Sequence, residues 1–194
     1  MIKKAFYQLE IWHLQGVKLE LSINIAAQQL QQKDFIGRLQ YQISLHPELK
    51  PEYIQFEILE TRSLDDVIET AKVISECRVL GYSFALDDFG TGYSSLTYLR
   101  RLPVNLIKID KSFVIDMLID PDDFSIIAGI MGLTSGFDLS VIAEGVETSA
   151  HVEALLKLGC KLAQGYHIAK PMPASEFVKW SKSWEPDSSW RTVA

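Results

Sequence analysis

Residues 82–96 read YSFALDDFGTGYSSL, and this stretch indicates how the chain folds. The alternating apolar residues of YSFAL predict a β-strand. Two adjacent carboxylates, Asp87 and Asp88, end that strand, and two glycines and two serines follow where the next helix should begin. The stretch therefore predicts a strand that delivers two acidic groups to a tight, polar turn.

Five other runs rich in β-branched and aromatic residues also predict strands. Most are separated from the next by a segment with apolar residues at helical spacing. Strands that alternate with helices of this length imply right-handed crossovers and a parallel sheet. The five runs are KLELSIN (18–24), YIQFEI (53–58), LIKID (106–110), SVIAE (140–144) and KLAQGY (161–166).

The predicted helices carry recognisable start and stop signals. Ser63 with Asp66 forms a capping box, and Gly81 stands where a glycine ends that helix. The same signals frame residues 121–136, which begin at Pro121 and end in a glycine, and residues 148–159, which run from a threonine to a glycine. In the turn after Asp88, Ser94 and Ser95 are suited to cap a short helix.

Each predicted strand ends on a residue that can bind a cation or move a proton. A single such residue is explained as a solvated loop residue or a helix cap, but the pattern at every strand is not. In a parallel barrel the carboxyl ends of the strands converge on the face where chemistry is built, so the chain resembles a (β/α) barrel with a functional rim. In chain order the residues are Asn24, Glu57, Asp87 with Asp88, Lys108 with Asp110, Glu144, and Gln164.

Composition limits the possible partners and the compartment. The 194 residues predict a single domain, and the net charge of −6 opposes a general affinity for nucleic acid or for anionic membranes. Cys77 and Cys160 lack zinc or disulfide spacing, which favours a reducing, cytoplasmic setting. The start is no signal peptide, and the longest apolar run, FSIIAGIMGL, is too short to span a bilayer. We expect no membrane contact by this segment.

The rim residues suit a pair of hard cations. Carboxylate and amide oxygens favour Mg²⁺ or Mn²⁺, and two such ions activate a water and stabilise the leaving oxygen of a phosphodiester. Asp87 and Asp88 allow one carboxylate to bridge both ions. Lys108 is placed to orient the water, or alternatively to form a buried structural ion pair with Asp110 or Asp88. Glu144 fits either a metal ligand or a general base.

Six stretches carry a family resemblance: LSIN, FEILE, FALDDFGTGYSSL, LIKIDKSFV, VIAEGVET and LAQGYHIAKPMP. Together they resemble the EAL-domain family of cyclic di-GMP phosphodiesterases. The resemblance covers roughly residues 19–177 and implies a modified TIM (β/α)8 barrel. It also implies hydrolysis of one ester bond of cyclic di-GMP to the linear dinucleotide pGpG, with two Mg²⁺ or Mn²⁺ ions.

By this resemblance, Asn24, Glu57 and Asp87 match ligands of the first ion. Asp87 is the bridging residue, and Asp88 and Glu144 match the side of the second ion. Glu144 is also the family's candidate for the general base.

The resemblance also implies roles for other rim residues. Lys108 matches the lysine that orients the attacking water, and Gln164 matches an amide near that water. The remaining matches support the loop and the rim: Glu60 braces the DFGTGYSS loop, Glu147 is the second acid of EGVET, Asp110 belongs to the KID motif, and Gly90 and Gly92 allow the turn.

Other features depart from the family pattern. The E-A-L or E-V-L motif and the arginine that follows it have no match, and the chain begins in the helix before the Asn24 strand. We therefore expect only the last six strand and helix units of the barrel, with residues 1–180 a partial EAL domain and 181–194 a tail. Such a chain should hydrolyse cyclic di-GMP slowly or not at all, and should self-associate through open sheet edges. The parent protein has room for an upstream sensor or cyclase domain and for a membrane tether.

Two other functions remain open on the sequence. The chain fits a catalytically inactive module that binds cyclic di-GMP or a partner protein, which the missing glutamate and arginine favour. An unrelated barrel enzyme acting on a phosphorylated metabolite is the third reading. Near the C-terminus, Phe177 and Trp180 are expected to pack a closing helix against the barrel, with base stacking by the tryptophans as the alternative.

Overall fold

The computed structural model describes residues 1–59, 64–91, 96–186 and 190. All six predicted strands are present in these residues and follow one another in a sheet of order β1-β2-β3-β4-β5-β6. The pairs β1–β2, β4–β5 and β5–β6 are parallel, which confirms the α/β class and the parallel sheet. The strands are β1 (Leu21–Ile25), β2 (Ile54–Leu59), β3 (Ser83–Phe89), β4 (Leu106–Ile109), β5 (Ser140–Ala143) and β6 (Leu162–Ala163).

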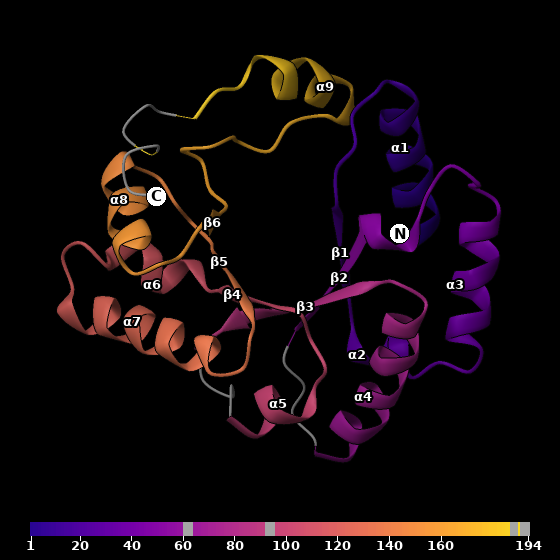
Figure 1. Ribbon diagram of the computed structural model, residues 1–194, viewed down its shortest axis with the longest axis horizontal. Helices are drawn as coiled ribbons and strands as arrows, with labels where there is room; N and C mark the ends of the chain where they lie inside the picture. The colour runs from indigo at the N-terminus through magenta and orange to yellow at the C-terminus, as the bar shows by residue number, and fades with distance from the viewer. Residues whose placement is uncertain (60–63, 92–95, 187–189, 191–194) are drawn as a thin grey trace. The chain divides into compact units, whose positions relative to one another are not determined.

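The chain divides into two compact units, and each is described by itself. The first contains residues 1–86 and 93–105, and the second contains residues 87–92 and 106–194. In the first unit, α1, α3 and α4 lie along one side of β1 and β2 (Figure 1). Its helices are α1 (Ile2–Leu14), α2 (Ala27–Leu30), α3 (Phe35–Ser44), the 3-10 turn η1 (Pro51–Tyr53), α4 (Leu64–Val79) and α5 (Leu96–Arg101).

The core of the first unit is centred on Phe56 of β2. Its ring centroid lies 5.4 Å from that of Phe84, 5.7 Å from Tyr82 and 6.4 Å from Phe35. Residues 54–58 of β2 are all buried, as expected for a parallel strand that is covered on both faces. At the end of α4, Gly81 has φ +101°, and its N–H donates to the carbonyl of Arg78, so this glycine ends the helix as predicted.

The second unit contains the end of β3, strands β4 to β6 and the helices that follow them. Polar residues cap the starts of three of these helices, and the first of them directly follows a strand. Asp110 caps α6 by accepting from the N–H of Ser112, Asp120 caps α7, and Thr148 caps α8. In Figure 1, α6, α7 and α8 lie on one side of β4 and β5. The helices are α6 (Lys111–Asp116), α7 (Pro121–Ser135), α8 (Ser149–Lys157) and α9 (Ala174–Ser183).

The predicted closing helix is present as α9, with Phe177 and Trp180 half-buried. It contains no buried residue, and Phe177 and Trp180 contact each other with their ring centroids 5.6 Å apart. The contacts continue from Trp180 through Trp184 and Trp190 to His167. Because α9 ends at Ser183, the boundary predicted between domain and tail at residue 180 falls inside a helix.

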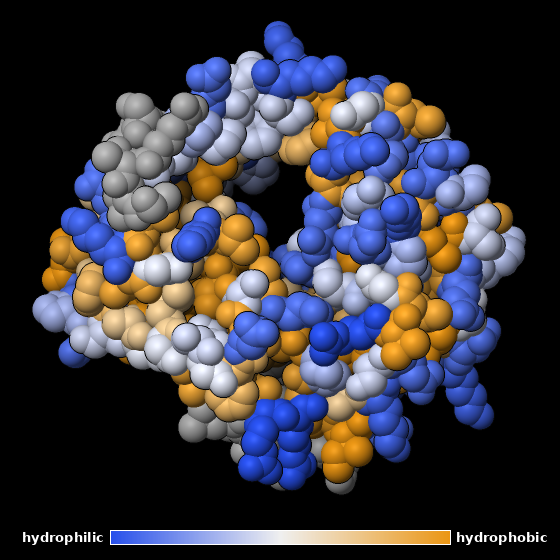
Figure 2. Space-filling view, viewed as in Figure 1, coloured by the Kyte–Doolittle hydropathy of each residue, from blue (hydrophilic) through white to orange (hydrophobic). Residues whose placement is uncertain are grey.

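The described surface is mixed in polarity. Figure 2 shows apolar atoms over α7, where Phe124 and Ile126 are each more than a third exposed. Within the described residues, no helix combines the length and the apolar character needed to cross a lipid bilayer.

Candidate metal and active site

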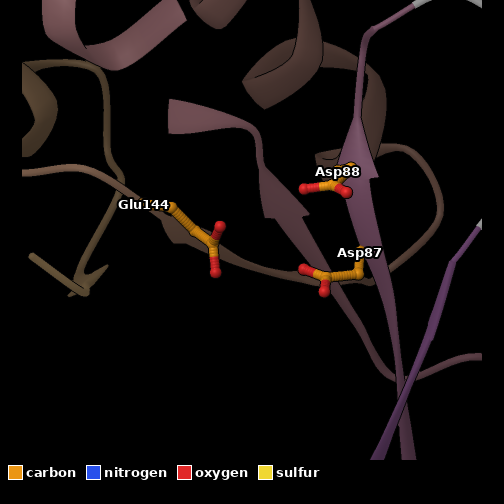
Figure 3. Close-up of side chains that lie close together, drawn as sticks. All are labelled: Asp87, Asp88 and Glu144. Carbon is orange, nitrogen blue, oxygen red and sulfur yellow. The ribbon is translucent and has the colours of Figure 1, made fainter. Parts of the chain in front are cut away.

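Three carboxylates of the second unit converge on one point. Asp87 and Asp88 project from the end of β3, Glu144 directly follows β5, and the three groups point toward one another (Figure 3). Each offers one oxygen, and these oxygens lie within 4.8 Å of one another. Three carboxylates this close repel one another unless a cation lies among them, so the cluster has the donor set of a hard-cation site.

Lys108 of β4 supplies a positive charge to this cluster. Its Nζ lies 2.9 Å from Oδ1 of Asp87 and 2.5 Å from Oε1 of Glu144, and the residue is only 3 % exposed. Lys108 is therefore in a buried ion-pair cluster, as in the alternative to a water-orienting role. The alternative expected Asp110 or Asp88 as the partner, whereas these two ion pairs are made with Asp87 and Glu144.

Oδ1 of Asp87 is a buried oxygen whose charge partner is the ammonium of Lys108, 2.9 Å away. Among the described residues it accepts no further hydrogen bond. A carboxylate oxygen has more than one acceptor site, so Oδ1 retains the capacity to bind a divalent cation. The side chains therefore fit a bound metal.

Asp88 is held in an unusual backbone conformation. Its φ is +53°, a left-handed value that aspartate adopts more readily than most residues. Burial, the charge of Asp87 and a hydrogen bond with Asp110 raise the pKa of Asp88. Burial opposes ionisation of Asp110 as well, but hydrogen bonds from the side chain and the N–H of Ser112 outweigh it and lower the pKa of Asp110.

The raised pKa of Asp88 predicts a pH-dependent effect of Asp88→Asn on the metal-free protein. A carboxyl whose folded pKa exceeds its unfolded value destabilises the fold when ionised, and this penalty vanishes as the pH falls through the folded pKa. Thermal unfolding of Asp88→Asn should therefore occur at a higher temperature than that of the natural chain at pH 7.5. The gain should shrink as the pH falls toward 3.8, the ordinary value. A gain that is unchanged across this range would contradict the assignment.

The loop from Glu144 to Thr148 is tightly packed at two glycines. Gly145 has φ +73°, and a Cβ built there would lie 2.6 Å from Cβ of Lys111. A Cβ at Gly165 would collide with the backbone of Val146. Both positions require glycine, because the loop passes directly against the start of α6 and against the segment after β6.

Gly145→Ala should therefore displace Glu144. We expect a loss of about 1–3 kcal/mol in the free energy of unfolding and weaker Mn²⁺ binding. Gly132→Ala is the matched control, because nothing lies within 4 Å of its Cβ in α7, and alanine there should stabilise the helix by about 0.5–1 kcal/mol. Denaturant titration and calorimetry with Mn²⁺ measure the two effects. Equal behaviour of the two variants would refute the packing argument.

In the first unit, the structure pairs two of the predicted ligands. Asn24 of β1 and Glu57 of β2 are partners in the parallel register, so they stand side by side at the carboxyl ends of adjacent strands. Asn24 is exposed, and Glu57 is 6 % exposed. An exposed amide beside a largely buried carboxylate is a pair of oxygen donors of the predicted type.

The other predicted residues lie in varied settings. Gln164 follows β6, where its N–H donates to the carbonyl of Ala143, and its side chain is exposed. Glu147 is also exposed. Gly90 has φ +108° and passes close to Phe113, as a tight turn requires. Five residues singled out from the sequence lie outside the described part of the chain: Glu60, Ser63, Gly92, Ser94 and Ser95.

Two polar residues near these motifs have structural roles that were not predicted from the sequence. The side-chain oxygen of Asn105 accepts a hydrogen bond from the N–H of Phe84, and the N–H of Asn105 donates to the carbonyl of Phe84. These two bonds connect β3 to the turn before β4. His151 accepts a hydrogen bond from the N–H of Glu147. The sequence signal for this role was the position of His151, three residues after the capping Thr148. A side chain at that position commonly accepts a hydrogen bond from a backbone N–H at the start of the helix.

Comparison with known proteins agrees with this geometry. The family model of the EAL domain matches residues 1–171. The chain belongs to the EAL-domain family. The match confirms the resemblance read from the sequence motifs, and it includes α1 and every strand.

Individual EAL-domain proteins are similar over most of the chain. The cyclic di-GMP phosphodiesterase PdeR of Escherichia coli is 37 % identical over 90 % of the chain and 26 % of the relative. The EAL domain of DcpA from Mycobacterium smegmatis has a TM-score of 0.88 at 32 % identity, covering 95 % of this chain and 84 % of that one. A manganese and cyclic di-GMP complex of BlrP1 from Klebsiella pneumoniae has a TM-score of 0.77 at 31 % identity, and the match covers 87 % of this chain and 43 % of that one.

These comparisons also confirm the fold class, because the matched structures are EAL domains with the same α/β architecture. The chain spans about a quarter of the length of the curated relatives that it matches.

Proposed function

We propose that the chain is a metal-dependent phosphodiesterase that hydrolyses one ester bond of cyclic di-GMP to give pGpG. The observation that carries this proposal is the cluster of Asp87, Asp88 and Glu144 around the buried Lys108, in a chain of the EAL-domain family. PdeR is named as a cyclic di-GMP phosphodiesterase, and the BlrP1 structure is described as a complex with manganese and cyclic di-GMP. These names support cyclic di-GMP as the substrate and a divalent cation as the cofactor.

The proposed cofactors are two Mg²⁺ or Mn²⁺ ions. Asn24, Glu57 and Asp87 would hold the first, and Asp87, Asp88 and Glu144 the second, with Asp87 shared. When bound, such ions lower the pKa of a water and neutralise the phosphate.

The chain's own groups complete the proposed mechanism. Lys108 would orient the attacking water and offset negative charge that develops on the phosphate, and Glu144 would take the proton of that water. Gln164 would hold the water by its amide. The supporting positions of the loop and rim are Glu60, Gly90, Gly92, Asp110 and Glu147.

The second candidate is an inactive module that binds cyclic di-GMP or a partner protein. The ion pairs of Lys108 favour it, because they already compensate two of the three carboxylates without any metal. In this reading the ligand binds and is not cleaved.

Incubation with cyclic di-GMP and Mn²⁺, followed by chromatography of the products, separates the two candidates. We expect slow formation of pGpG that stops when a chelator is added, and its loss in Glu144→Gln, which keeps a side chain of the same shape. Ligand binding in calorimetry without any pGpG would favour the inactive module. Formation of pGpG in the presence of the chelator would refute the metal-dependent mechanism.

We further propose that the chain self-associates and acts in the cytoplasm. Strands β1 and β6 stand at the two ends of the strand order, and edge strands tend to pair with other strands. Sedimentation at several concentrations tests this, and a monomer at every concentration would refute it. The proposed parent protein carries an upstream sensor or cyclase domain.

A further inference from the structure

The loop that carries Glu144 depends on a few hydrogen bonds for its position. The N–H of Glu144 donates to the carbonyl of Ile109 at 3.2 Å. The N–H of Val146 donates to the carbonyl of Gln164 at 3.0 Å, and the carbonyl of Val146 accepts from the N–H of His167 at 3.0 Å. These bonds fix the first half of the loop to its neighbours on both sides.

The second half of the loop is held by His151. The N–H of Glu147 donates to Nδ1 of His151 at 3.3 Å. In return, the N–H of His151 donates to Oγ1 of Thr148 at 3.2 Å, so the loop and the first turn of α8 hold each other. This arrangement resembles a capping box in which histidine takes the place usually filled by glutamate or glutamine.

The donor identifies the tautomer of His151. A backbone N–H can only donate, so Nδ1 must be the unprotonated nitrogen, and the proton of the neutral ring is on Nε2. His151 is 6 % exposed, so the acceptor side of this hydrogen bond is largely shielded from solvent.

We propose that His151 is a positioning residue for Glu144. It fixes the loop from Glu147 to Thr148 and thereby holds the Glu144 carboxylate against Asp87, Asp88 and Lys108. His151 touches none of the reacting groups and acts through the loop. The expected effect on metal affinity rests on the proposed function, in which the carboxylate of Glu144 binds a metal ion.

Loss of the imidazole acceptor has a defined structural effect. In His151→Leu the N–H of Glu147 loses the acceptor that ties the loop to α8, so the loop should move to find another acceptor. Glu144 then becomes less ordered in the cluster. Residues that orient a metal ligand typically contribute about 10-fold to 100-fold in metal affinity, and we expect about 10-fold here.

NMR spectroscopy of the natural chain tests the hydrogen bond directly. We expect the nitrogen shifts of His151 at neutral pH to show a neutral ring protonated on Nε2, and the amide of Glu147 to be protected from hydrogen exchange. A ring protonated on Nδ1, or a Glu147 amide that exchanges at the rate of a free amide, would overturn the proposal.

Three variants test the positioning of Glu144. In His151→Asn the amide oxygen lies as many bonds from Cα as Nδ1 does, so it can accept from Glu147, and we expect Mn²⁺ affinity within about twofold of the natural chain. His151→Leu should bind about 10-fold more weakly. Val152→Ala, at the next buried position of α8, is the control for loss of packing and should retain the natural affinity. Equal loss in the leucine and asparagine variants, or in the leucine variant and the control, would overturn the proposal.

Metal-free spectra distinguish this proposal from the proposed function. The carboxyl carbon resonance of Glu144 should shift in His151→Leu and stay in place in His151→Asn, whether or not the chain binds Mn²⁺. Should the natural chain bind no Mn²⁺, the proposed function fails while this shift still decides the role of His151. An unshifted Glu144 resonance in His151→Leu would overturn the positioning role.

Discussion

Asp87→Asn is expected to weaken Mn²⁺ binding by at least about 100-fold, more than the 10-fold to 100-fold that changes around a metal ligand cost. Asp87 is the proposed bridging ligand, and its buried Oδ1 lies 2.9 Å from Nζ of Lys108 and accepts no further hydrogen bond from the described residues. The fold should remain, because the variant loses one ion pair with Lys108 and also loses one of three mutually repelling carboxylates. Calorimetric titration with Mn²⁺ measures the affinity, and circular dichroism measures the fold.

Asp122→Asn, at an exposed position of α7, is the matched control for Asp87→Asn and should bind Mn²⁺ as the natural chain does. Hydrolysis of cyclic di-GMP should be lost with metal binding in the Asp87 variant and unaffected in the control. Unchanged Mn²⁺ affinity in Asp87→Asn would remove this residue from the metal site.

Lys108→Met should have the opposite effect on metal binding. The variant keeps the carboxylates of Asp87, Asp88 and Glu144 but removes the ammonium that lies 2.5–2.9 Å from two of them. In the absence of metal the fold should lose about 3–5 kcal/mol of unfolding free energy, because buried charges are left without their partner. Mn²⁺ affinity should be retained or increased, since the cation no longer competes with the lysine. Hydrolysis should fall by at least about 100-fold.

Thermal unfolding with and without Mn²⁺ measures the metal-dependent part of this prediction. Mn²⁺ should raise the unfolding temperature of Lys108→Met by more than it raises that of the natural chain. Lys157→Met, at an exposed position of α8, is the matched control and should leave stability, Mn²⁺ binding and hydrolysis unchanged. Loss of Mn²⁺ binding in Lys108→Met would mean that the lysine is needed to assemble the ligands.

The strands and helix ends were predictable because their causes are local. Alternating or continuous apolar runs marked all six strands, and Gly81, Pro121 and Thr148 marked helix ends where the structure has them. The same pattern predicted the position of β6 but not its length. Only two residues of β6 pair with β5, and this pairing depends on the neighbouring strand.

The role of Asp110 shows how two interpretations of one residue can both hold. As a residue at the end of a strand it was a candidate for the rim, and the general alternative for any such residue was a solvated loop position or a helix cap. The structure confirms the cap, through Ser112, and also connects Asp110 to Asp88. Its support of the rim remains a prediction.

The sequence by itself determined the order of strands and helices, the acidic and amide groups at the strand ends, and the motifs of the EAL-domain family. These features reside in short stretches, where periodicity, capping and residue type act over a few positions. Only the tertiary structure decided that Lys108 pairs with Asp87 and Glu144, that the loop after Glu144 requires glycine at Gly145, and that His151 holds this loop. Each of these depends on distances between segments far apart in the chain, or on the direction in which a side chain leaves a turn. Distances between distant segments are set by packing, and no local pattern in the sequence encodes them. His151 did carry a local signal, its place three residues after Thr148, but only the structure showed that its ring accepts from Glu147.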